Sequence, residues 1–162
     1  MSTSDTIFLA GGEPPDSVAA RLADALRLER VDDPGLTEGE HFFRGPARTV
    51  EGRVLLVVGP NIYGEQDPEP EDVSAIDRYT GVVHVRIAGS RNEERQADEA
   101  RAIFDELAAA QPSTALVLAH AMSWIVAAYL PGRGVHTFPP ETSLDVEDID
   151  TWAPWVVGSH DG

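Results

Sequence analysis

Apolar runs of the length expected for strands recur along the chain. Thr6–Ala10 and Arg53–Val58 are continuous apolar stretches rich in β-branched residues, and both predict buried strands. Val82–Ile87 alternates between an apolar face and a face that carries His84 and Arg86, which also predicts a strand. Leu116–Ala119 predicts a further strand, and His41–Arg44 predicts a short edge strand. Because Arg53–Val58 is apolar on both faces, we expect it to be central and covered on both sides, or covered by the opposing layer and a long loop.

Two other segments repeat apolar residues with the period of an α-helix. The first runs from a cap at Asp16 or Ser17 to about Leu28, and the second runs from about Asn92 to Ala110. The side chains expected to pack on the sheet are Leu22, Leu26, Phe104 and Leu107.

The order of these elements predicts a single α+β domain over residues 1–162, with two helices packed on a mostly antiparallel sheet. A ferredoxin-like split β-α-β arrangement is a natural candidate for it. Met122–Leu130 fits either a strand or a helix, and its Trp, Ile, Val and Tyr residues favour the strand. From about residue 131 onwards we expect a loop-rich tail.

The net charge of the chain favours some classes of binding partner over others. The 162 residues hold 28 Asp and Glu against 12 basic residues, all of them Arg, which gives a formal net charge of −16. This field disfavours nucleic acid and anionic membranes, and it favours a basic protein surface. The absence of Lys fits either a biased genome composition or a high-salt habitat, and the sequence does not separate the two.

Several chemistries lack their sequence signatures. The chain has no Cys, no zinc-type His spacing and no serine-hydrolase elbow, so we predict no metal and no cofactor. Gly11 and Gly12 are followed by Glu13 and Asp16, whose carboxylates would repel a phosphate. The N-terminus lacks the basic and apolar regions of a signal peptide, and no apolar run could span a membrane, so we expect a cytoplasmic protein.

The most unusual segment is the acidic, proline-containing stretch between Gly59 and Asp77. Its carboxylates repel one another and its prolines oppose regular structure, so we expect a solvated loop that bulges from the sheet. Calcium binding is disfavoured because Asp72 and Arg78 stand where a calcium loop needs Gly and Glu. The residues expected to meet a basic partner are Tyr63, Glu65, Asp67, Glu69, Glu71 and Asp72.

A second set of candidates could carry acid–base chemistry. His84 and Arg86 share one face of a predicted strand, and His120 ends another strand, where side chains often line open sites. The remaining aromatic residues are Trp124, Tyr129, Trp152 and Trp155. Such residues near a terminus can anchor a partner, but we expect this tail to fold back and cover an open side of the sheet.

Two function classes follow. The first is a small acidic, non-enzymatic protein that binds a basic protein, like inhibitor or immunity proteins in charge and size alone. The alternative is a small α+β enzyme or ligand-binding domain with a site at His84, Arg86 or His120. The lack of a catalytic motif favours the first class. A deep pocket that holds one of these His residues beside a carboxylate would favour the second.

Overall fold

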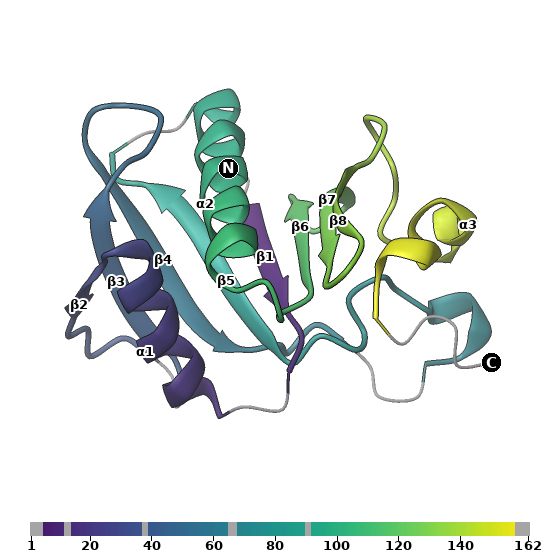
Figure 1. Ribbon diagram of the computed structural model, residues 1–162, viewed down its shortest axis with the longest axis horizontal. Coiled ribbons are helices and arrows are strands. Elements are labelled where there is room, and N and C mark those ends of the chain that lie inside the picture. The colour runs from purple at the N-terminus through teal and green to yellow at the C-terminus, as the bar shows by residue number, and fades with distance from the viewer. Residues whose placement is uncertain (1–4, 12–13, 37–38, 65–67, 90–91, 158–162) are drawn as a thin grey trace.

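The computed structural model describes residues 5–11, 14–36, 39–64, 68–89 and 92–157, which form an α+β structure (Figure 1). Within these residues eight strands make one sheet in the order β2-β3-β4-β5-β1-β6-β7-β8, with every neighbouring pair antiparallel. The strands are β1 (Asp5–Leu9), β2 (Glu29–Val31), β3 (His41–Pro46), β4 (Arg53–Pro60), β5 (Gly81–Ile87), β6 (Leu116–His120), β7 (Trp124–Leu130) and β8 (Gly134–Thr137).

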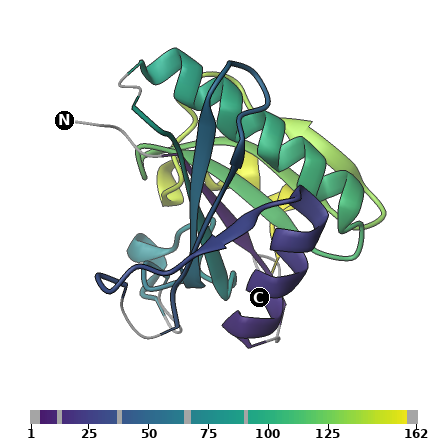
Figure 2. The same ribbon diagram turned by 90° about the vertical axis from the view of Figure 1, so that its left-hand side faces the viewer.

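Two long helices cover one face of the sheet. They are α1 (Pro15–Leu26) and α2 (Glu93–Ala110), and they pack against each other as well as on the strands (Figure 2). Leu22, Leu26, Phe104 and Leu107 are fully buried in this layer together with Leu56 of β4, as the apolar periodicity predicts. Alternation along each strand sends every second side chain into this core.

The opposite face is covered over only part of its width. The third helix, α3 (Ile149–Trp152), and the 3₁₀ turns η1 (Pro70–Asp72), η2 (Val146–Asp148) and η3 (Ala153–Trp155) lie on this side. The prediction of two helices is therefore wrong by one. Helix α3 is a single turn, too short to show a repeat in the sequence. The expected loop-rich tail holds β8 and these turns, and Trp152 is fully buried and donates its indole N–H to the Asp145 carbonyl at 3.0 Å.

The edges of the sheet differ from the prediction. Strand β2 pairs outside β3, so the segment at His41 is not an edge strand. The three residues of β2 are too few and too polar to show a strand pattern in the sequence. The ambiguous segment after Met122 forms strand β7, as its composition favours.

The start of α1 also departs from the predicted cap. Pro14 occupies the cap position with no side-chain hydrogen bond, and a proline in the first turn leaves no extra N–H unsatisfied. Asp16 instead accepts a hydrogen bond from Nε2 of buried His41 at 2.7 Å, and Arg30 donates to Nδ1 of the same ring at 2.7 Å. Asp16 therefore ties α1 to β2 and β3.

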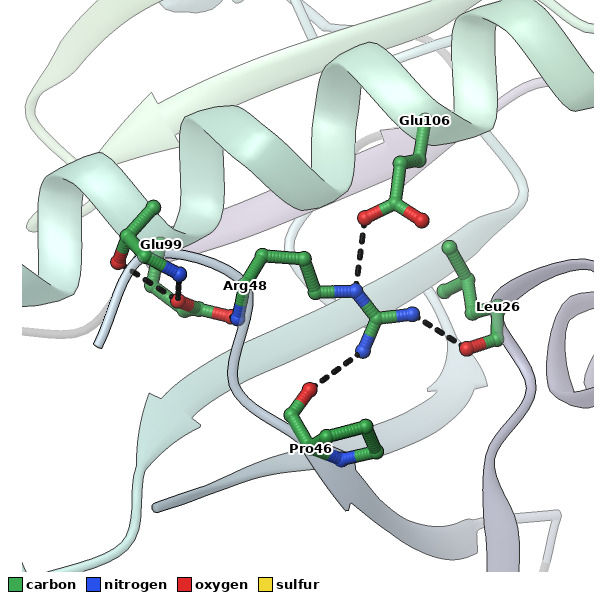
Figure 3. A network of polar contacts seen from close by, with 6 residues as sticks. Leu26, Pro46, Arg48, Glu99 and Glu106 are labelled. Carbon is green, nitrogen blue, oxygen red and sulfur yellow. Dashed lines mark hydrogen bonds and ion pairs between the residues drawn. The ribbon is translucent and has the colours of Figure 1, made fainter. Parts of the chain in front are cut away.

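A buried carboxylate on α2 fixes the turn between β3 and β4. Glu99 is fully buried and accepts hydrogen bonds from the backbone N–H of Arg48 at 2.7 Å and of Thr49 at 2.9 Å, and from the Thr49 hydroxyl at 2.8 Å. The Arg48 guanidinium donates to Glu106 at 2.7 Å and to the carbonyls of Pro46 and Leu26 (Figure 3). This network joins α1, α2 and the turn.

Candidate functional site

Two acidic stretches that are far apart in the sequence lie side by side. Ser74 and Asp145 form an isolated antiparallel bridge, and the Ala75 N–H donates to the Leu144 carbonyl at 2.9 Å. The turns η1 and η2 therefore meet on the right-hand side of Figure 1. We call this region, residues 68–79 with 141–152, the acidic lobe.

The acidic lobe presents carboxylates to solvent. Among the loop residues predicted to meet a partner, Glu69, Glu71 and Asp72 are exposed, whereas Glu65 and Asp67 lie outside the described residues. The further exposed acidic residues of the lobe are Glu141, Asp145, Glu147 and Asp150. In the described part of the chain no three His, Cys, Asp or Glu side chains gather closely enough to hold a metal ion.

The second half of the acidic loop is anchored in the core and does not bulge freely. Ala75, Ile76 and Tyr79 are buried, and the Asn61 side-chain amide donates to the carbonyls of Ile76 at 3.1 Å and Tyr79 at 2.7 Å. Burial raises the pKa of Tyr79, whose hydroxyl accepts from the Val157 N–H at 3.3 Å. The expectation of a wholly solvated loop is wrong here because Ala75, Ile76 and Tyr79 are buried in the apolar cluster on the face of the sheet opposite α1 and α2.

Two apolar side chains stand exposed at the base of this loop. Ile62 is 77% exposed and Tyr63 is 44% exposed. The Tyr63 ring makes edge contacts with Phe8, at a centroid distance of 6.4 Å, and with His84, at 6.0 Å. Its backbone N–H donates to the Asn61 side chain at 2.9 Å. Tyr63 is therefore held in place while much of its surface stays in water.

From Tyr63 a strip of side chains crosses the uncovered part of the sheet. His84, Val57 and Phe42 pair in register across β5, β4 and β3 and so point to the same face. The core cluster on this face includes no residue of β3 or β4. Phe42 and Val57 are partly exposed, so the prediction that β4 is covered on both sides is wrong. We call Tyr63, His84, Val57 and Phe42 the open strip.

The three predicted acid–base residues do not form one site. His84 and Arg86 lie on the same face of β5, as their spacing predicts, and Arg86 is exposed. His84 lies 3.3 Å from the Thr6 hydroxyl through Nδ1 and 3.5 Å from the Tyr63 hydroxyl through Nε2. Burial lowers the pKa of His84, and the charge of Glu40 opposes this. His120 lies on the opposite face, where its register partner is Asp5.

His120 is paired with a buried carboxylate that the sequence analysis missed. Its Nδ1 lies 2.6 Å from Oδ1 of Asp5, which is 2% exposed, and burial raises the pKa of Asp5. The turn after His120 places Ala121 and Met122 in the left-handed region, both at φ 55°. Three cavities lined by described residues lie elsewhere, and their linings do not include His84, Arg86 or His120.

Comparison of the chain with protein-family models, curated proteins and solved structures gives no significant match. Over the described ranges, no helix combines the length and apolar character needed to cross a membrane. A function must therefore be argued from the geometry of the acidic lobe, the open strip and the His120 pair.

Proposed function

We propose that the chain is a non-enzymatic binding protein that docks a basic protein surface on its acidic lobe and open strip. The observation that carries this proposal is the convergence of two acidic stretches beside the exposed Ile62 and Tyr63. A partner that fits has an apolar centre for the aromatic residues and a rim of Lys or Arg for the carboxylates.

The two parts of this surface have different physical roles. Exposed carboxylates mainly raise the association rate with a basic surface, and this advantage fades as salt rises. Aromatic anchors held in place before binding supply most of the affinity, because little side-chain entropy is lost when they are covered. The contact of Tyr63 with Phe8 and His84 gives it this property.

We also propose a ferredoxin-like arrangement for the centre of the sheet and the cytoplasm as the compartment of the protein. The strand order β4-β5-β1-β6, with α1 and α2 on one face, supports a ferredoxin-like split β-α-β core that β2–β3 and β7–β8 extend. A chain without Cys fits the reducing cytoplasm as its place of action.

The test compares variants in binding to one identified partner. A partner captured from native lysate at low salt is identified, purified and assayed for association kinetics. We expect Glu69→Gln with Glu71→Gln and Asp72→Asn to slow association by roughly 3- to 10-fold at low salt, with the difference fading at high salt. Tyr63→Ala should mainly speed dissociation.

The matched control changes three exposed carboxylates on the helices, through Asp24→Asn, Glu94→Gln and Asp98→Asn. This variant has the same net charge as the acidic-lobe variant and should associate faster than it does. Equal rates for the two variants would reduce the effect to net charge and contradict the proposed surface. Unfolding of the acidic-lobe variant would show a structural role instead.

A second candidate function rests on the Asp5–His120 pair. A His whose Nδ1 is held by a buried carboxylate presents Nε2 for general acid–base chemistry, and the His120 side chain is 24% exposed. Turnover of activated carboxylic and phosphoric esters that is lost in His120→Gln would support this candidate. Equal rates in the two proteins would contradict it.

A further inference from the structure

Three arginines from separate elements line one cavity at the end of the sheet remote from the acidic lobe. Arg27 follows α1, Arg44 lies on β3 and Arg53 begins β4, and together with Glu29 they line a space of about 310 Å³. In the sequence these arginines are isolated from one another. The pairing of β3 with β4 brings Arg44 and Arg53 together, and Arg27 joins them from the end of α1.

The backbone builds this cavity. Arg27 ends α1 in the left-handed conformation, at φ 56° and ψ 51°, and its N–H donates back to Asp24 at 3.3 Å. At Gly45, an added Cβ would lie 2.7 Å from the end of the Leu28 side chain, which would have to move aside, and 3.5 Å from the Arg27 carbonyl oxygen, so β3 runs close to the end of α1 here. These two features set the Arg27 backbone against β3.

The cavity holds more positive charge than its own carboxylate balances. Arg44 donates twice to one oxygen of Glu29, from Nε at 3.2 Å and from a terminal nitrogen at 2.8 Å. These hydrogen bonds lower the pKa of Glu29, and the charge of Arg53 acts in the same direction. Over the described residues, the side chains of Arg27 and Arg53 make no hydrogen bond or ion pair, and both are exposed.

We propose that this cavity is a binding site for the dianionic phosphate group of a small molecule, held between the guanidinium groups of Arg27 and Arg53. A guanidinium group can donate two parallel hydrogen bonds to two oxygens of one phosphate. Glu29 forms its ion pair with Arg44, so the positive charges of Arg27 and Arg53 are left to balance the two negative charges of the phosphate. The net negative charge of the molecule does not decide binding, because exposed charges beyond about 8–10 Å are screened at physiological salt.

The volume of the cavity and the ion pair between Arg44 and Glu29 limit the kind of ligand that fits. A space of about 310 Å³ lies at the lower end of the range for small-molecule sites, roughly 300–1,000 Å³. The ion pair with Glu29 holds Arg44 in place as a wall of the cavity, so Arg27 and Arg53 remain for the incoming anion. Free phosphate and a phosphate monoester share this chemistry.

The experiment titrates inorganic phosphate and phenyl phosphate into the full chain at constant ionic strength, with calorimetry and amide NMR shifts as readouts. We expect saturable binding, with the amide shifts centred on residues 44–45 and 52–53. Arg27→Gln and Arg53→Gln should each weaken binding by roughly 5-fold or more, as loss of a charge-assisted hydrogen bond predicts. If phenyl phosphate binds more tightly than inorganic phosphate, the ligand is a larger molecule that carries a phosphate group. If the two bind equally, the ligand is free phosphate.

The matched control is Arg95→Gln, which removes an exposed arginine that does not line the cavity. This variant should bind as the unchanged protein does. Circular dichroism identifies any variant that fails to fold, and the other single variant then carries the test. Equal weakening by Arg95→Gln, no saturable binding, or tighter binding of citrate than of phosphate through the same arginines would each overturn the proposal.

Discussion

At the scale of single residues, His84 combines desolvation with contact to an exposed aromatic side chain. Folding places it between the Thr6 hydroxyl and the Tyr63 ring, and the charge of Glu40 favours its protonated form less strongly than burial disfavours it. Protonation of His84 therefore opposes folding, and it also places a positive charge in the open strip that a basic partner is proposed to cover.

The pKa of His84 in the folded protein lies below its unfolded value of about 6.5, so the unfolded chain binds the proton more tightly. The stability that His84 contributes is therefore present above pH 6.5 and is lost as pH falls through the folded pKa. The loss has an upper limit of about 1.4 kcal/mol per pH unit. Urea unfolding at pH 7.5 and 5.5 should show a smaller decrease for His84→Gln than for the unchanged protein. An identical decrease in both would contradict this assignment.

Single residues also mark the limit of what the sequence predicts about the sites. Asp5 looks like a polar residue before a strand, and Glu99 looks like one more carboxylate on an acidic helix. Both are buried against hydrogen-bond partners that lie at least 50 positions away in the chain. The partner of Asp5 is His120, and the partner of Glu99 is the turn at Arg48–Thr49. No local pattern carries that information.

At the scale of elements, β4 has two apolar faces with different surroundings. Its inner face, including Leu56, is fully buried beneath α1, whereas Leu55 and Val57 on the other face are partly exposed. The apolar pattern correctly predicts the strand and its inner packing. It does not show whether a second layer extends over the outer face, because that depends on how far the C-terminal segment reaches across the sheet.

Neighbouring leucines on β4 give a matched comparison of the two faces. Leu56→Ala should lower the free energy of unfolding by about 2–5 kcal/mol, since it leaves a cavity in a closed core. Leu55→Ala should cost roughly 1 kcal/mol, because its side chain already meets water. Denaturant unfolding of both variants measures the difference. Similar losses for the two variants would mean that the outer face is covered as well.

Short elements escape prediction for a different reason. Strand β2 and helix α3 contain three and four residues, too few to repeat the amphipathic pattern that would identify them. Both form because longer neighbours pair with them or bury them, as Trp152 of α3 shows. The longer elements, α2 above all, begin and end within one or two residues of where their sequence predicts.

At the scale of the whole molecule, charge is distributed unevenly. The acidic lobe gathers exposed carboxylates at the end of the molecule where Figure 1 shows α3. Arg27, Arg44 and Arg53 line a cavity at the other end of the sheet, beside β3 and β4. The net charge of −16 hides this separation. The two proposed sites therefore attract opposite kinds of ligand, and one can be removed by substitution without altering the other.

Repulsion within the acidic lobe should make the stability of the whole chain depend on salt. The screening length falls from about 10 Å at 0.1 M salt to about 3 Å at 1 M, which removes most repulsion between exposed carboxylates. The variant Glu69→Gln, Glu71→Gln, Asp72→Asn relieves part of that repulsion in advance. Its melting temperature at low salt should equal or exceed that of the unchanged protein, and should rise less with salt. Each kcal/mol of relieved repulsion corresponds to roughly 2–4 °C in a domain of this size. Calorimetric scans at both salt concentrations measure this difference. A larger salt response in the variant than in the unchanged protein would contradict repulsion within the lobe.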